Sequence, residues 1–150
     1  MNRTFFAIAA VTLFLVLFNV GYLFHEPLMG AWLHEREAAI ARDQFIIPLI
    51  AAAFAAYSLV LAHLFPIYRS YYARAPLMPT AVRFGILMGF VWDALQGGII
   101  EVATFKMPFS VFLVDSGYHV LVEGTIAGIV LGFVARRWPP APVGRERAAS

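Results

Sequence analysis

The chain has 150 residues, of which 61% are hydrophobic and 13% charged, with a formal net charge of +2 and a mean hydropathy of +0.77. This composition excludes an ordinary soluble domain and is typical of a membrane protein. The absence of cysteine excludes disulfides, thiolate metal sites and a cysteine nucleophile. The excess of arginine falls in loops and tail, as the positive-inside rule predicts, so the expected partner is the bilayer and not a nucleic acid.

Four segments are long and apolar enough to cross a bilayer, which requires about 20 residues. They are 5–24, 45–65, 81–105 and 108–134. The first is interpreted as a retained anchor, because no small-residue cleavage pattern follows it. We therefore predict an all-α integral membrane protein, a four-helix bundle forming one domain over residues 1–138.

The connection between the first two segments carries its own pattern. Apolar residues recur there at roughly helical spacing, namely Leu28, Trp32, Leu33, Ala39 and Ile40. A short interfacial helix is expected. The pairs His25-Glu26 and His34-Glu35 could bind a metal, but we interpret them as solvated surface groups. If this helix closes over the bundle, His25 and His34 would join any site there.

The distribution of Lys and Arg predicts the orientation. Eight of the eleven lie in the N-terminus, the second connection and the C-terminal tail, and three lie in the other two connections. The positive-inside rule then places both termini in the cytoplasm. Residues 139–150 are rich in proline and polar groups, so we expect a disordered cytoplasmic tail.

Polar residues repeat at intervals of four in the last two segments. Asp93 and Glu101 share a face of the third, and Asp115, His119 and Glu123 share a face of the fourth. With Gln96 they form what we call the polar seam. Glycines suited to close helix packing accompany it, namely Gly85, Gly89, Gly97, Gly124, Gly128 and Gly132.

The third and fourth segments are joined by only three residues, Lys106 to Pro108, so they are expected to form an antiparallel hairpin. A turn centred on Pro108 would place Asp93 level with Glu123, and Glu101 level with Asp115. His119 would then lie between the two levels.

A charged side chain near the bilayer centre costs roughly 2.5 to 3.5 kcal/mol on insertion scales. The carboxylates of the seam can persist if they share protons, bind cations, or hydrogen-bond to His119. We therefore expect cation binding or proton relay, as part of a transport path, with Asp115, His119 and Glu123 as ligands of a divalent metal. Haem is not expected, because His63 is interpreted as an interfacial hydrogen-bonding group.

Two alternatives stay open. A membrane metalloenzyme would need a bound metal with an open coordination position beside a cavity that lipid can reach. In an accessory subunit of a membrane complex, the seam would only hold the helices together through hydrogen bonds, as hydrogen-bond glue without any chemistry. No hydrolase or redox motif completes an enzyme. Four helices are few for a transport path, and the glycine faces favour a homodimer that could complete one.

One stretch is similar to a known family. The pairs Trp92-Asp93 and Val114-Asp115, with the Ala103-Thr104-Phe105-Lys106 turn between them, resemble a family of small uncharacterised bacterial inner-membrane proteins of about four spans. The resemblance implies a bacterial inner-membrane location and a matched pair of aspartates. It implies no activity, and the other seam residues lie outside that pattern.

Overall fold

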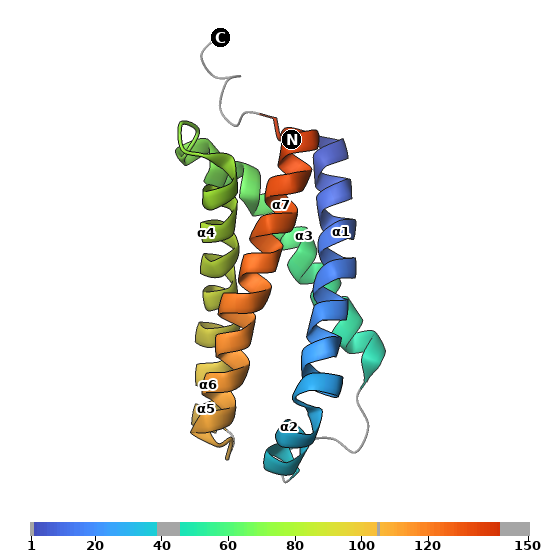
Figure 1. Cartoon of the computed structure of the whole chain (residues 1–150), viewed down its shortest axis with the longest axis vertical. Coiled ribbons are helices and arrows are strands. Elements are labelled where there is room, and N and C mark those ends of the chain that lie inside the picture. The colour runs from blue at the N-terminus through green and yellow to red at the C-terminus, as the bar shows by residue number, and fades with distance from the viewer. Residues whose placement is uncertain (1, 39–45, 105, 142–150) are drawn as a thin grey trace.

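The computed structural model describes residues 2–38, 46–104 and 106–141, and the side chains at 95–97 and 101 lie outside the description. Within those ranges the chain forms helices and no strands, which confirms the predicted all-α class. Figure 1 shows the helices running largely along one axis, with α3 crossing behind the others.

The helical elements group into four rods. The first two are α1 Arg3–Leu23 with η1 Phe24–Leu28, and α3 Ile47–Tyr71. The third is α4 Leu77–Gly89, η2 Phe90–Gly98 and α5 Ile99–Thr104, and the fourth is α6 Phe109–Gly117, η3 Tyr118–Glu123 and α7 Gly124–Arg137. The η elements are π-helical. A shorter helix, α2 Gly30–Glu37, lies in the connection where the sequence predicts one.

Among the described residues, three helices are long and apolar enough to cross a membrane, and they are Arg3–Leu28, Ile47–Tyr71 and Phe109–Arg137. They overlap the first, second and fourth predicted spans. The predicted third span, 81–105, falls on the rod formed by α4, η2 and α5. That rod is helical from Leu77 to Thr104, and its crossing of the membrane stays a prediction.

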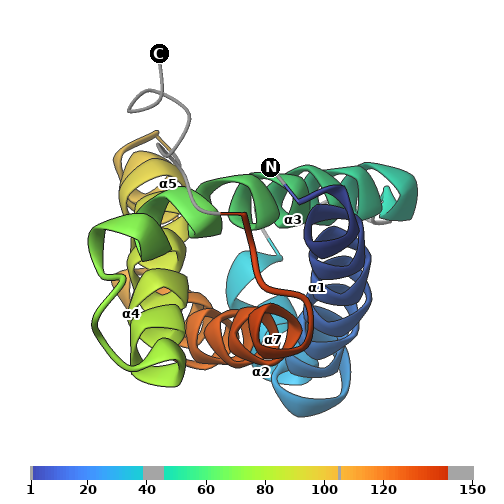
Figure 2. The ribbon, with the colours of Figure 1, turned by 90° about the horizontal axis from the view of Figure 1, so that it is seen from above.

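The four rods surround a common interior (Figure 2). The rod of α4 packs against α7, and α1 packs against both α3 and α7. The first helix begins where Asn2 accepts hydrogen bonds from the backbone N–H groups of Thr4 and Phe5. The side-chain amide of Asn2 also donates to the carbonyl of Pro139 at 2.8 Å. The beginning of α1 and the end of α7 therefore lie at the same end of the bundle.

Glycines bring the backbones of α4 and α7 together. A Cβ at Gly85 would collide with the backbone of Gly124, and one at Gly128 would collide with the backbone of Val82. A Cβ at Gly89 would lie 2.9 Å from the carbonyl oxygen of His119, which is also too close. Gly132 faces Met78, whereas the surroundings of Gly97 lie outside the described residues. These glycine faces are covered within one chain, so they give no support to the predicted homodimer.

The observed register of this hairpin differs from the predicted one. A turn centred on Pro108 would place Gly85 level with Leu131, whereas its observed partner Gly124 lies about two turns earlier. The prediction that Asp93 is level with Glu123 is therefore wrong, because Gly89, one turn before Asp93, already lies against His119 and Val120. The cause is twofold. The turn lies between Thr104 and Phe109, so its middle comes before Pro108. In addition, η2 contains more π-helical residues than η3, and because a π-helix has more residues per turn, the third rod uses more residues than the fourth to cover the same length.

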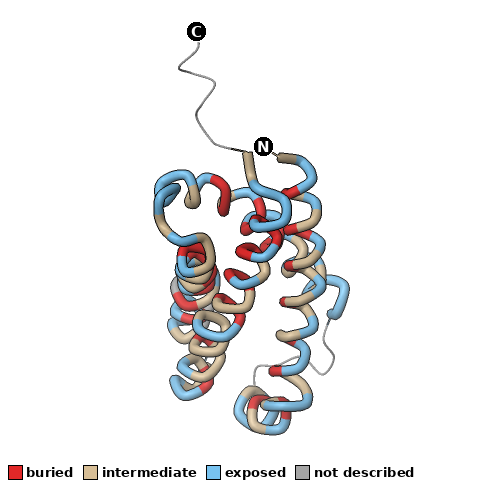
Figure 3. Tube along the Cα trace, turned by 45° about the horizontal axis from the view of Figure 1, so that its top comes forward, coloured by how far each residue is buried: buried red, intermediate tan, exposed pale blue. Residues whose placement is uncertain are grey.

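Buried apolar residues form two clusters at different depths (Figure 3). The larger draws on α1, α3, α4 and α7, around Phe5, Leu13 and Phe65. The smaller contains Phe24, Leu33 and Val111, so α2 is attached to the bundle through Leu33. Along the fourth rod, residues 115–123 occupy the interval between these clusters. The polar side chains of that interval are therefore held between two apolar layers.

Candidate metal centre

Three side chains converge where η1 meets the fourth rod. His25 Nε2 lies 3.0 Å from Asp115 Oδ1, and His119 Nε2 lies 3.6 Å from the same oxygen. The potential ligand atoms of the three residues all lie within 4.8 Å of one another. The centroids of the two imidazole rings are 5.4 Å apart. One carboxylate oxygen thus faces the Nε2 atoms of two histidines.

Each imidazole is fixed through its other nitrogen. His25 Nδ1 donates to the carbonyl of Gly21 at 2.9 Å, one turn earlier on α1. His119 Nδ1 donates to Glu123 Oε2 at 2.7 Å, one turn later on the fourth rod. Since a carbonyl and a carboxylate are acceptors, both rings carry a proton on Nδ1 and direct Nε2 at Asp115. Asp115 is an acceptor too, so His25 Nε2 donates to it, and a metal ion bound by that nitrogen would replace the proton. Histidines that ligate metals are oriented in this way by backbone carbonyls and carboxylates.

The two separations measured from Asp115 Oδ1 suit a small cation. Metal–ligand bonds of about 2.0 to 2.2 Å place the ligand atoms of a four-coordinate ion roughly 3.3 Å apart. The two separations at Asp115 Oδ1, 3.0 and 3.6 Å, bracket that value. Two imidazoles and one carboxylate provide three protein ligands and leave further positions open, as in catalytic zinc and non-haem iron sites.

All three π-helical segments carry polar groups of this region. His25 lies in η1, Asp93 in η2, and His119 with Glu123 in η3. π-Helical turns are rare, and they occur frequently at functional sites. In three separate rods, therefore, the helix departs from regular α-helical geometry at the position of these polar residues.

Tyr118 joins the first and last rods beside the histidines. Its ring stacks on Phe24 with centroids 3.7 Å apart and planes at 6°, and its hydroxyl donates to the carbonyl of Val20 at 2.7 Å. Both partners are near His25 in the chain. These contacts hold η1 against η3, which positions His25 opposite Asp115.

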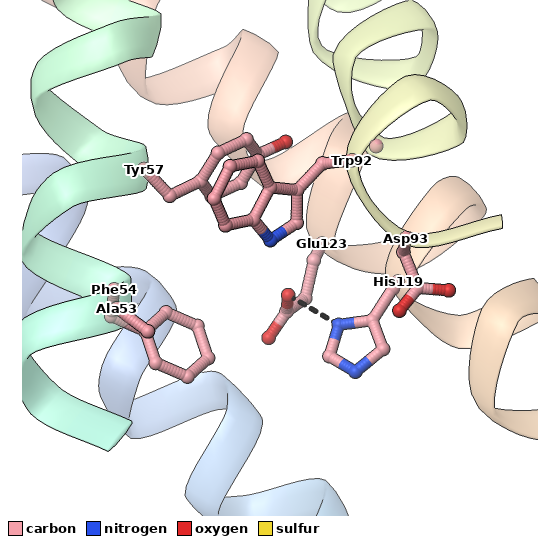
Figure 4. A pocket seen from close by; sticks show the side chains of 8 residues that line it. Ala53, Phe54, Tyr57, Trp92, Asp93, His119 and Glu123 are labelled. Carbon is pink, nitrogen blue, oxygen red and sulfur yellow. Dashed lines mark hydrogen bonds and ion pairs between the residues drawn. The ribbon is translucent and has the colours of Figure 1, made fainter. Parts of the chain in front are cut away.

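A cavity of about 170 Å³ adjoins the centre between α3, η2 and η3. In Figure 4 the carboxylate of Glu123 and that of Asp93 lie on opposite sides of the His119 ring, and both residues line this cavity. Asp93 Oδ2 and Glu123 Oε1 are buried without a hydrogen-bond partner in the described part of the chain. Although the register differs from the prediction, both carboxylates therefore reach the same space.

A second cavity, of about 240 Å³, lies on the other side of the centre. His25 and His119 contribute to its wall, which is otherwise mostly apolar and includes Phe18, Ile50 and Phe54. His119 and Phe54 line both cavities, and the second cavity also includes the carboxylate residue Glu26.

The structure unites part of the polar seam and adds one residue to it. Asp115, His119 and Glu123 are in contact, as their spacing predicts, whereas the side chains of Gln96 and Glu101 lie outside the description. Our interpretation of His25 as a solvated surface group is wrong, because it is half-buried and bonded to Asp115.

The spacing of four that identified the polar seam could not identify His25, because its partner Asp115 is 90 residues away in the sequence. The one sequence signal was its position at the end of the first span. His34 is exposed on α2 and is not a member of the cluster.

Comparison with known proteins gave no match to any family model, curated protein or solved structure. The resemblance to small bacterial inner-membrane proteins stays an expectation. The function proposed below is therefore inferred from the geometry of the site.

Proposed function

We propose that this protein is a four-span protein of a bacterial inner membrane, with both termini in the cytoplasm, that binds a divalent transition-metal ion through His25, Asp115 and His119. One observation carries the proposal. Both histidines direct Nε2 at the same carboxylate oxygen while their Nδ1 atoms are bonded to acceptors.

The donor set narrows the class of ion. Imidazole nitrogen suits zinc, iron, nickel and copper(II), and carboxylate oxygen adds manganese. A site without sulfur disfavours copper(I), which prefers thiolate or thioether ligands. Zinc, iron(II) and manganese(II) are therefore the ions to test first.

The surroundings support a role in moving cations or protons within the membrane. Metal binding displaces protons from imidazole, and a linked set of groups is at hand to accept them. Glu123 accepts from His119, His119 faces Asp115, and Asp115 faces His25. Ionisable groups at such depth are costly, and they commonly mark ion or proton paths.

A membrane metalloenzyme is the second candidate, and the cavity of about 240 Å³ favours it. That cavity touches both histidines and has mostly apolar walls, so an apolar substrate in it would lie beside an open coordination position. Bound metal that supports no movement of ions across vesicles would favour this candidate over transport.

The first test is the metal content of the full chain purified in detergent, without added chelator. The proposal predicts about one equivalent in the wild-type protein, and a loss in His25→Ala. His63→Ala is the matched control, because His63 is exposed on α3 and should leave the metal in place. Wild-type protein that takes up no zinc, iron or manganese would contradict the proposal and favour proton relay or hydrogen-bond glue.

A further inference from the structure

The cavity of about 170 Å³ has features that the metal centre does not use. Its aromatic wall is formed by Phe54, Tyr57 and Trp92. The rings of Tyr57 and Trp92 are stacked, with centroids 4.9 Å apart and planes at 22°. Figure 4 shows these rings above the carboxylate of Glu123, with the ring of Phe54 facing the same carboxylate.

The same cavity is rich in acceptors, and the imidazole of His119 is the one basic side chain among the described residues that line it. Asp93 Oδ2 and Glu123 Oε1 have no hydrogen-bond partner in the described part of the chain, and Glu123 is only 4% exposed. Neither lysine nor arginine is among the described residues that line it. Buried carboxylate oxygens without donors are unfavourable, and a cation in the cavity would satisfy them.

We propose that this cavity is a binding site for a small quaternary ammonium ion. The faces of tryptophan, tyrosine and phenylalanine attract such cations and contact their methyl groups, which cannot donate conventional hydrogen bonds. The two carboxylates supply the countercharge. The cavity is slightly larger than the engineered cavity of about 150 Å³ that admits benzene, so a cation of choline size fits.

This site is separate from the metal centre in composition. Trp92, Tyr57 and Asp93 line the cavity and are not metal ligands, whereas His25 and Asp115 are metal ligands and do not line it. The proposed metal ligand His119 also lines the cavity, as does Glu123, which accepts a hydrogen bond from His119 and is not itself a ligand. Ligand binding in the cavity can therefore be removed by substitutions that leave the three proposed metal ligands unchanged.

The test is calorimetric titration of the full chain with choline, in a maltoside detergent that contains no ammonium group. The neutral analogue 3,3-dimethylbutan-1-ol has nearly the same shape without the charge, and it serves as the matched ligand. We expect choline to bind at least tenfold more tightly than the alcohol, because the aromatic faces and carboxylates attract only the cation. Equal binding of the two, or no binding of choline, would overturn the proposal.

Substitutions then locate the ligand. Trp92→Leu should weaken choline binding about tenfold, while Trp92→Phe, which keeps an aromatic face, should retain most of it. Asp93→Asn should also weaken binding, and Asp115→Asn should not. Binding that survives Trp92→Leu in a folded protein would overturn the proposal. If Trp92→Leu does not fold, the comparison of choline with its neutral analogue decides alone.

Discussion

His25 and Asp115 are separated by 90 residues in the sequence, yet His25 Nε2 lies 3.0 Å from Asp115 Oδ1. This contact joins the end of the first rod to the first third of the fourth rod. His119 reaches the same oxygen from one turn further along, at 3.6 Å. The cluster therefore depends on how two distant spans pack, and it provides the three ligands of the proposed centre.

Asp115→Asn separates a metal site from hydrogen-bond glue. Asparagine keeps the shape and one acceptor oxygen, so helix content by circular dichroism and the elution volume should be unchanged. The charge and one ligand oxygen are lost, so metal binding should weaken by more than tenfold, as measured by chelator competition. A variant that binds metal as tightly as the wild-type protein would contradict the assigned role of Asp115.

Glu123→Gln tests the group that orients His119. Glu123 accepts from His119 Nδ1 at 2.7 Å and contributes no ligand to the proposed centre. Loss of such a supporting carboxylate typically lowers metal affinity 10- to 100-fold. Because all three proposed ligands remain, the variant should still bind one equivalent of metal at saturation.

The matched control for this variant is Glu35→Gln, because the Glu35 carboxylate is exposed on α2. Its metal affinity should equal that of the wild-type protein. Equal affinities in Glu123→Gln and Glu35→Gln would show that Glu123 does not support the site.

Gly85→Ala tests the close packing of α4 on α7. A Cβ there would meet the backbone of Gly124, which cannot rotate away as a side chain can. We expect a loss of about 1 to 3 kcal/mol or more in the free energy of unfolding, from overpacking. The readout is the melting temperature in detergent.

Gly117→Ala is the control for that experiment. No atom lies within 4 Å of a Cβ built at Gly117, and alanine is the better helix former by about 1 kcal/mol. This variant should melt at the same temperature as the wild-type protein or higher. A Gly85→Ala protein that matches it would contradict the observed register.

The third rod offers a test of the four-span topology. Because the chain has no cysteine, single cysteines can be introduced at Ser70 and Lys106, on either side of that rod. If the rod crosses the membrane, an impermeant maleimide added outside intact spheroplasts should label Lys106→Cys and not Ser70→Cys. Equal labelling of both would show that this rod does not span.

The sequence was sufficient to predict the helical class and the stripe of Asp115, His119 and Glu123, because hydropathy and a spacing of four depend on local geometry. It was not sufficient for His25, because periodicity within one helix contains no information on which distant span packs against it. The register of the hairpin was also predicted wrongly, because the prediction assumed regular α-helices and a π-helical turn contains more residues than an α-helical one. Asp93 accordingly lies level with residues that precede His119, and not with Glu123.

The most direct measurement is X-ray absorption at the edge of the bound metal, on the wild-type protein and on His25→Ala. We expect nitrogen and oxygen ligands bound directly to the metal, with more distant scattering from two imidazoles per metal in the wild-type protein and from one in the variant. A wild-type spectrum with no imidazole scattering, or one that His25→Ala leaves unchanged, would contradict the assignment of His25, Asp115 and His119 as the metal centre.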